Sequence, residues 1–599
     1  MNASPRMPGR LSLVVVFLLV VFCLGTFEIT EHDYWWHLAT GKYIIEHGRI
    51  PVEDVFSFTA TKPWIAHYWL ADVAGYGLYR WIGTPGMIVL NALLITFSFW
   101  IVLRITLARG AGLVLSFLVV LLAVYASRTR FYVRPETCSF LLMAIYLFLF
   151  DRWKRRGGAL PLVLFPLLQL LWVNLYGGGS VVGLVLLFCF VAGEALNALV
   201  PLSGGRRKTK GAVAFLAVSA LAAFCLSFAN PNTYRTVFYF LMSRDPVFRY
   251  ILEWRHMEMK DLLSIHGLFL FLGAVLLIRF ARSTNFTDLL LFSAFGYLSV
   301  DAPRSVPFFA IAAAPLIGER LQRAAAPFLR ARGFDSSLRR NERWIASVLA
   351  FAVAAFTLWY LCKDIGKFHR DYAFGFGINK KLFPIEAVDF IEEHDIEGPF
   401  FNSYGIGGYL IWRFYPRWKV FIDGRVEMYG TDFLKEYMIY WHPEVWGGYV
   451  RKYGINCAIV DREPNYTTRY LDDTPEWVLV FFDDRAMVYL GNVPGNRELI
   501  ERFGYRFLRP GCLRFDYLDR YLANPVMARL VIEEIKRSLH DEIYNLNARL
   551  MLGYCYTRLG GEYLPRALEE YRAALKLMPE GEDIQKKIDR LEGIMGPLP

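Results

Sequence analysis

The sequence is poor in charged residues and lacks paired cysteine motifs, and each lack excludes a class of protein. Only 20% of the 599 residues are charged, whereas 55% are hydrophobic and 16% are aromatic, which excludes an ordinary soluble chain. The eight cysteines are scattered and form no CxxC pair, so neither a structural zinc site nor a disulfide framework is indicated. The net charge of +11 comes from basic residues in short loops between apolar runs. It indicates membrane topology rather than nucleic-acid binding.

Apolar runs fill the first part of the chain, residues 1–362. The runs that are long enough to cross a hydrocarbon layer predict about eleven transmembrane helices in a polytopic α-helical membrane protein. They fall near residues 11–27, 86–105, 111–127, 137–151, 160–176, 181–200, 211–229, 263–280, 286–301, 304–318 and 344–362. The first run could be a cleaved signal peptide, but no clear small-x-small cleavage site follows it. We interpret it as an uncleaved signal anchor.

Clusters of Arg and Lys set the orientation of these helices. They precede the first run and follow every second one, as at 152–156 and 206–210. All of them lie on the cytoplasmic side if the N-terminus is cytoplasmic and the helices alternate. We therefore expect a multi-pass protein of the bacterial inner membrane, whose polar and aromatic motifs gather on the external face.

Past residue 362 the chain has no further apolar run that is long enough to span a membrane, and it divides into two parts. Residues 363–523 combine helical periodicity with short buried strands, which predicts an extracytoplasmic α/β domain with a hairpin at 477–490. Residues 524–599 are predicted to be helical, and 547–579 fits one tetratricopeptide unit. A single unit needs a neighbour to bury its faces. The tail is therefore either a helical hairpin that closes the domain or a site for a protein partner.

Two carboxylates, Glu31 and Asp33, stand near the start of the long external loop, residues 28–85. A carboxylate at this place can serve as a general base or as a ligand of a hard cation such as Mg²⁺ or Mn²⁺. Either role suits glycosyl or phosphoryl transfer. The alternative is a solvated loop in which a carboxylate caps a helix.

The order of these features resembles the GT-C membrane glycosyltransferases. The resemblance includes the E-x-D element, the aromatic block 33–37, Arg134-Pro135-Glu136 and the stretch 172–177, where Tyr176 stands in place of a histidine. It implies transfer of a hexose or pentose from a polyprenyl-phosphate carrier to an extracytoplasmic acceptor: an envelope glycan, a lipid or a protein. It also implies that Asp33, and then Glu31, is the catalytic base or metal ligand.

Cations and aromatic side chains complete the predicted site on the external face. Guanidinium groups match phosphate oxygens, which makes Arg134, Arg304 and Arg235 the candidate ligands of the donor phosphate. The candidate sugar-binding residues come from the external loops. They are His37, Trp36, His67, Trp69, Asn174, Tyr176 and Glu253.

Two motifs of the α/β domain have two interpretations each. Residues 402–409 contain Gly407-Gly408, and Asp423-Gly424-Arg425 ends a predicted strand. Both could bind a ligand or acceptor, but a turn with a buried Asp–Arg pair is favoured. For the whole protein, two alternatives to an enzyme stay open. One is a non-catalytic scaffold of an envelope complex that uses the tail, and the other is a lipid-linked glycan transporter or polymerase.

Overall fold

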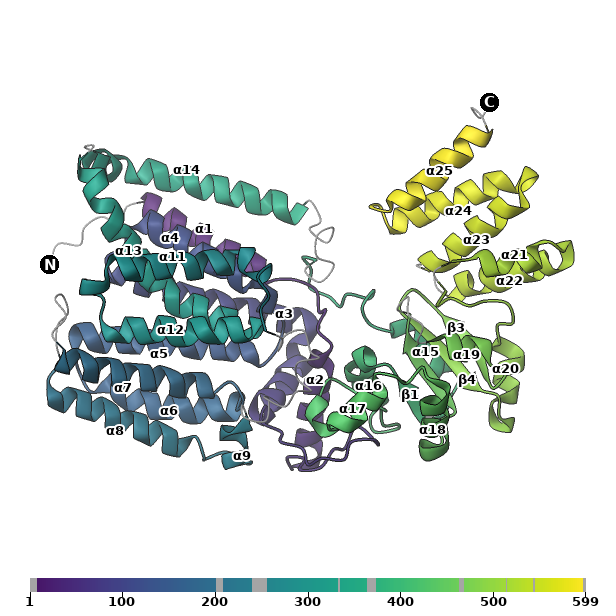
Figure 1. The fold of residues 1–599 in the computed structure, drawn as a ribbon, viewed down its shortest axis with the longest axis horizontal. Coiled ribbons are helices and arrows are strands. Elements are labelled where there is room, and N and C mark those ends of the chain that lie inside the picture. Colours follow the sequence, from purple (N-terminus) through teal and green to yellow (C-terminus); the bar gives the residue numbers. More distant parts are fainter. Residues whose placement is uncertain are drawn as a thin grey trace. The chain divides into compact units, whose positions relative to one another are not determined.

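The protein is described by a computed structural model that covers residues 8–200, 208–239, 256–331, 334–362, 373–462, 468–512, 514–541 and 545–595. The contacts divide the chain into two compact units (Figure 1). The first unit comprises Met1–Val52 and Trp64–Ile378, and the second comprises Glu53–Pro63 and Asn379–Pro599. The segment Glu53–Pro63 therefore belongs to the second unit, although it lies in the loop that follows the first helix. The sequence did not predict this.

The first unit is a bundle of long helices. Every predicted apolar run coincides with a helix: α1 (Pro8–Leu24), α3 (Trp69–Ala108), α4 (Leu113–Ser127), α5 (Glu136–Arg156), α6 (Leu160–Leu175), α7 (Val181–Leu199), α8 (Lys210–Leu226), α11 (Ile265–Arg279), α12 (Phe286–Asp301), α13 (Val306–Ala331) and α14 (Phe334–Cys362). Phenylalanines fill the space between them, as where Phe308 of α13 lies 5.3 Å from Phe140 of α5.

Three helices within the described ranges are long and apolar enough to cross a membrane: Trp69–Ala108, Leu113–Arg130 and Val181–Leu199. Five further described helices are apolar but shorter, at Leu11–Leu24, Leu160–Leu175, Lys210–Leu226, Ile265–Arg279 and Ser347–Trp359. These findings support a membrane location. The count of about eleven spans stays a prediction.

The loop that follows α1 contains a helix that packs on the start of α3. This helix, α2 (Asp33–His47), ends at Gly48, whose φ of 64° is a left-handed conformation that suits glycine. Gly41 allows the close approach, because a Cβ there would lie 2.0 Å from the carbonyl oxygen of Asp72 on α3. Helix α3 itself is kinked at Gly83, just before Pro85. The predicted run 86–105 begins after this kink, so the sequence missed the first part of α3.

Ion pairs join helix ends at the end of the bundle that the charge clusters predict to be cytoplasmic. Arg109, after α3, lies 3.0 Å from Asp288 on α12 and 3.5 Å from Asp151 on α5. Lys154 of α5 lies 2.6 Å from Glu194 of α7. The candidate site lies at the opposite end of the bundle, where α5 begins and α6 ends.

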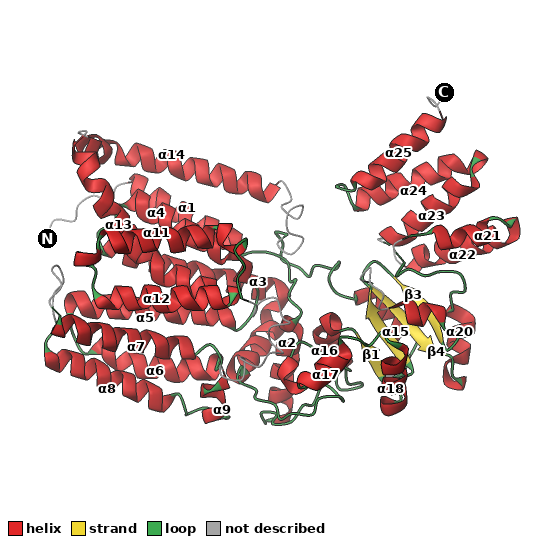
Figure 2. Ribbon diagram, viewed as in Figure 1, coloured by secondary structure: helices red, strands yellow, loops and turns green. Residues whose placement is uncertain are grey.

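The second unit is built on a mixed sheet with the strand order β1-β2-β4-β3 (Figure 2). Strand β1 (Phe400–Asn402) pairs in parallel with β2 (Cys457–Asp461), and β4 (Ala486–Gly491) pairs antiparallel with both β2 and β3 (Trp477–Phe482). The predicted hairpin is therefore confirmed. The accompanying helices are α15 (Ile385–Glu393), α16 (Gly407–Phe414), α17 (Thr431–Tyr437), α18 (Pro443–Tyr453), α19 (Arg469–Asp473) and α20 (Arg497–Phe503).

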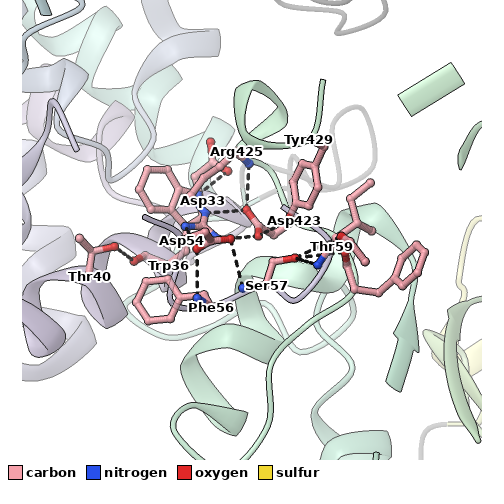
Figure 3. A network of polar contacts seen from close by, with 12 residues as sticks. Asp33, Trp36, Thr40, Asp54, Phe56, Ser57, Thr59, Asp423, Arg425 and Tyr429 are labelled. Atoms are coloured by element: carbon pink, nitrogen blue, oxygen red, sulfur yellow. Dashed lines mark hydrogen bonds and ion pairs between the residues drawn. The ribbon is translucent and has the colours of Figure 1, made fainter. Parts of the chain in front are cut away.

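The segment Glu53–Pro63 is bound to this unit by backbone and side-chain contacts. The backbone N–H of Val420 donates to Phe56 O (2.9 Å), and Phe58 N–H donates to Val420 O (3.2 Å). Arg425 lies between Asp54 and Asp423, with Nη1 2.8 Å from Asp54 Oδ1 and Nη2 2.7 Å from Asp423 Oδ2 (Figure 3). The predicted buried Asp–Arg pair is thus confirmed, and Asp54 extends it to a triad.

The tail consists of helices that follow one another closely. They are α22 (Pro525–Asp541), α23 (Leu546–Leu559), α24 (Leu564–Leu577) and α25 (Glu582–Met595), and the short helix α21 (Asp519–Leu522) precedes them. Gly553 of α23 faces the ring of Tyr571 on α24, since a Cβ there would lie 2.7 Å from that ring. The assignment of these helices as a tetratricopeptide unit stays a prediction.

Candidate active site

The two predicted carboxylates share one guanidinium. Arg134, which precedes α5, contacts Glu31 and lies 2.9 Å from Asp33 Oδ2. The other oxygen of Asp33, Oδ1, accepts the indole N–H of Trp36 at 2.9 Å (Figure 3). Both oxygens of Asp33 therefore already have donors. The side chains are 14% (Arg134), 13% (Glu31) and 26% (Asp33) exposed, so this group is reachable from solvent.

Aromatic rings continue from these carboxylates across the site. The rings of Trp36 and His37 stack with centroids 3.7 Å apart, and the edge of His37 meets Tyr68 at 4.8 Å. Tyr68 stacks on Tyr176 at 5.0 Å. His67 lies 3.9 Å from Tyr68. The rings come from α2, from the start of α3 and from the end of α6, so the helix packing brings them together.

The histidine of α2 has a carboxylate partner that the sequence did not reveal. His37 Nδ1 lies 2.6 Å from Asp72 Oδ1, and both side chains are buried. Burial lowers the pKa of His37, Asp72 raises it, and Arg134 and His67 lower it further, so the net shift is downward. His37 is therefore neutral at neutral pH.

Arg304 joins the other side of the aromatic group. This residue lies in the turn η6 (Pro303–Ser305) before α13. Its Nη2 donates to Tyr176 Oη at 2.7 Å and lies 3.5 Å from Glu136 Oε1 at the start of α5. Glu136 also binds Arg130, 2.5 Å away. The guanidinium of Arg304 keeps a side-chain exposure of 16%.

His67 is held in a single tautomer by its backbone contact. Its Nδ1 lies 2.9 Å from Ile65 O, an acceptor, so the proton is on Nδ1 and Nε2 carries the lone pair. Burial lowers the pKa of His67 to about 4, with Ile65 opposing and Arg304 adding to the shift. His67 is therefore a neutral acceptor and not a proton donor at neutral pH.

The remaining predicted residues differ in where they lie. Trp69 donates its indole N–H to Asn174 Oδ1 at 3.1 Å. In sequence, Trp69 directly follows Tyr68, and Asn174 precedes Tyr176 by two positions. Arg235 is exposed on the short helix α9 (Tyr234–Val237), and no contact found among the described residues joins it to Arg134 or Arg304. Glu253 lies outside the described residues.

The structure therefore connects most of the predicted residues and adds others. Glu31, Asp33, Trp36, His37, His67, Tyr176, Arg134 and Arg304 form one group through the contacts above. Glu136, Asp72 and Tyr68 are the residues that sequence reasoning missed as members of the site. Glu136 follows Arg134 by two positions, which is a signal that could have been used. The only sequence feature that points to Asp72 is its position just after an aromatic block, and this is weaker evidence for a place in the site.

The side chains do not fit a metal site built by the protein. Within the part of the chain that the structure describes, no three His, Cys, Asp or Glu side chains are placed to hold one ion. Arg134 contacts both Glu31 and Asp33, so a guanidinium stands where a cation would have to bind. The predicted Mg²⁺ or Mn²⁺ ligand pair has no support in this arrangement.

Known structures are similar to this chain in fold, whereas comparison by sequence identifies no family. No family model matches the chain, and no curated protein matches it. Its structure is similar to the oligosaccharyltransferase of Archaeoglobus fulgidus, with a TM-score of 0.50 and 12% identity over 81% of this chain and 74% of that chain.

Two other solved structures are similar at lower scores. The arabinofuranosyltransferase AftD from Mycobacteria has a TM-score of 0.47 and 14% identity, over 82% of this chain and 41% of that chain. ArnT from Cupriavidus metallidurans bound to undecaprenyl phosphate has a TM-score of 0.45 and 13% identity, over 80% of this chain and 97% of that chain. The chain has a GT-C-like fold.

Proposed function

We propose that the protein is a membrane glycosyltransferase that moves a sugar from a polyprenyl-phosphate carrier to an extracytoplasmic acceptor. The observation that supports this most is the group in which Arg134 and Arg304 stand on either side of stacked aromatic rings, beside Asp33. Cations for a phosphate, flat rings for a sugar and a carboxylate near both are the parts that such a transfer needs. They lie at one end of a GT-C-like helical unit.

Each part has a proposed role. Arg134 and Arg304 bind the donor phosphate and stabilise the departing polyprenyl phosphate, because a guanidinium can meet two phosphate oxygens at once. Asp33 deprotonates or orients the acceptor hydroxyl, and Glu31 holds Arg134 in place. Trp36, Trp69, Asn174 and Tyr176 contact the sugar with His37 and His67. Arg235 and Glu253 remain proposed contacts of the donor and the substrate.

The wider architecture is proposed on the same basis. We infer about eleven membrane spans, an N-terminus in the cytoplasm and an extracytoplasmic second unit, from the length and charge pattern of the apolar runs. The location is the inner membrane of a bacterium. The sugar is a hexose or a pentose and the acceptor an envelope component. The helical tail is proposed to bind a protein partner.

Transfer by the purified chain tests the function. The full-length protein in nanodiscs is given radiolabelled polyprenyl-phosphate glucose, mannose and arabinose with membrane extracts as acceptor. We expect transfer from one donor in wild type and its loss in Asp33→Asn, with an unchanged melting temperature. His47→Gln serves as the control, because His47 is exposed at the far end of α2. Full activity in Asp33→Asn removes the proposed mechanism.

The same measurements distinguish the two non-transferase candidates. A scaffold binds stable partners in a way that depends on residues 524–599 and binds no donor. A lipid-linked glycan transporter or polymerase moves or extends glycan whether or not Asp33 is replaced.

A further inference from the structure

His37 is held by Asp72 in the geometry of a general base with an orienting carboxylate. The Nδ1–Oδ1 distance is 2.6 Å, and the pair joins α2 to α3 where Gly41 lets the two helices meet. With the Nδ1 proton donated to the carboxylate, the lone pair of His37 is on Nε2. A carboxylate that fixes the tautomer of an imidazole is the arrangement that makes histidine an effective base.

The position of this pair places it within the proposed site. Trp36 donates to Asp33 and stacks on His37, while the rings of Tyr68 and His37 meet edge to face. Tyr68 in turn stacks on Tyr176, which accepts from Arg304. His37 therefore lies between the carboxylate that was expected to be catalytic and the arginine proposed for the phosphate. The exposed fraction of His37 is 9%, so this residue is largely but not completely shielded from solvent.

Asp33 is less suited to accept a proton. A general base needs a lone pair that faces the substrate. Each oxygen of Asp33 already accepts a donor, from Trp36 and from Arg134, so fewer of the roughly four lone-pair sites of this carboxylate remain for a substrate proton. The charged groups that face His37 are Asp72 on α3 and Arg134 before α5, with His67 nearby. Burial and the charge of Arg134 disfavour the imidazolium, which keeps the imidazole in its basic form.

We propose that His37, oriented by Asp72, is the general base of the transfer, and that Asp33 positions Arg134 and the acceptor. The acceptor hydroxyl gives its proton to His37 Nε2 while its oxygen forms a bond to the anomeric carbon. The bond between that carbon and the phosphate oxygen breaks, and polyprenyl phosphate leaves with the electron pair. His37 then returns the proton to solvent. This proposal rests on the proposed function.

Replacement of the two partners gives the first test, in the full-length protein with the donor that supports transfer. We expect His37→Gln to lower kcat by about 10² to 10⁴-fold with little change in KM for the donor, which is the contribution of a general base. His47→Gln on the same helix is the matched control. An unchanged kcat in a folded His37→Gln variant overturns the proposal.

The pH profile gives a readout that a purely structural role does not change. Asp72 raises the pKa of His37, so Asp72→Asn lowers that pKa and moves the acid limb of kcat to lower pH. This measurement also decides the matter if the His37 variants do not fold. An acid limb that stays in place in Asp72→Asn contradicts the role of the pair.

Chemical rescue separates the two candidate bases. Imidazole added to His37→Gly should restore transfer, and the rescue should grow with pH as imidazole loses its proton, whereas it should not restore Asp33→Asn. Absence of rescue, or equal rescue at all pH values, overturns the assignment of His37. If wild type transfers no sugar from any donor tested, both the proposed function and the proposed role of His37 are wrong. If wild type transfers sugar and the His37 variants do so equally well, only the assignment of His37 as the general base is wrong, and the proposed function stands.

Discussion

The two units of this protein each contain an arginine between two carboxylates, and they differ in burial. In the first unit, Arg134 joins Glu31 and Asp33, with side chains that are 13% to 26% exposed. In the second, Arg425 joins Asp54 and Asp423, with exposures of 3% or less. The ion-pair chemistry is the same in both. The difference lies in how much solvent, and therefore how much substrate, can reach the charges.

Further contacts hold the buried group in place. Tyr429 donates to Asp423, the backbone N–H groups of Phe56 and Ser57 donate to Asp54, and the ring of Phe56 lies 5.3 Å from the guanidinium carbon of Arg425. Burial raises the pKa of Asp423, but Arg425 and the hydrogen bonds more than offset this, so the net shift is downward. Such a group holds Glu53–Pro63 in the second unit.

The largest expected effect comes from breaking the buried group. Arg425→Met leaves two carboxylates buried without a counter-ion, which costs about 3 to 5 kcal/mol. We expect a large fall in the melting temperature of the full-length protein, followed by fluorescence because Trp446 and Trp477 are buried in this unit. Arg417→Met is the control, since its pair with Asp395 is exposed and worth about 1 kcal/mol or less.

A second variant sharpens this prediction. Adding Asp54→Asn and Asp423→Asn to Arg425→Met removes the unpaired charges and should recover part of the lost stability. A normal melting temperature in Arg425→Met alone would mean that the triad does not stabilise the unit.

The exposed group should show the opposite pattern, with loss of activity and little loss of stability. Arg134→Gln removes the charged contact that we propose for the donor phosphate, and removal of one such preorganised group costs about 10²-fold in rate or more. Since Arg134 is partly solvated, the melting temperature should change by only a few degrees. Transfer assays and melting curves on the same preparation test both halves. A variant that is fully active, or one that unfolds, contradicts the contrast between the units.

The sequence predicted one of these groups better than the other. Composition and charge placed the apolar helices, and two apolar runs separated by Asp483-Asp484-Arg485 placed the hairpin at 477–490, because both signals are local along the chain. The Asp423–Arg425 pair could also be predicted, since its members are two residues apart. Asp54 could not, because it reaches the pair from 371 positions away along the chain.

The candidate site was predicted in its residues but not in its pairs. Polar and aromatic motifs at helix ends identified Asp33, Arg134, Tyr176 and Arg304. Which of them touch depends on the packing of α2 on α3, and this rests on Gly41, a residue with no chemical signal of its own. The partner Asp72 was missed for that reason. The role of Glu31 and Asp33 as metal ligands stays a prediction, and the sequence did not reveal that Arg134 contacts both carboxylates.

A buried carboxylate that is bound by backbone N–H groups provides a third case. Asp483 Oδ1 accepts the N–H groups of Arg485 and Ala486 at 2.6 Å, and Oδ2 is buried with no hydrogen-bond partner. Burial raises the pKa of Asp483 to about 7, although the backbone donors oppose this. Since the folded-state pKa exceeds the unfolded value of about 4, its contribution to stability is greatest below pH 4 and is lost as the pH rises through 7.

Asp483→Asn should remove this dependence. The amide oxygen can still accept from the turn, so we expect the variant to gain about 1 to 3 kcal/mol relative to wild type between pH 5 and pH 8, the cost of an unsatisfied buried polar group. Melting temperatures at the two pH values give the difference. Asp472, whose burial also raises its pKa to about 7, titrates in both proteins and cancels. Parallel pH curves for the two proteins would show that Asp483 is not the group responsible.

The smallest effect tests whether Tyr176 belongs to the exposed group or only packs beside it. Tyr176→Phe keeps the ring that stacks on Tyr68 and removes the hydroxyl that accepts from Arg304. A hydrogen bond to a charged group is worth about 1.5 kcal/mol or more, so we expect about a tenfold rise in KM for the donor with an unchanged melting temperature. Tyr176→His places an imidazole acceptor near Arg304 and should recover part of that loss. If Tyr176→Phe instead lowers the melting temperature and leaves KM unchanged, the bond between Tyr176 and Arg304 stabilises the fold and does not serve donor binding. The contrast between a reactive and a structural arginine would then rest on Arg134 alone.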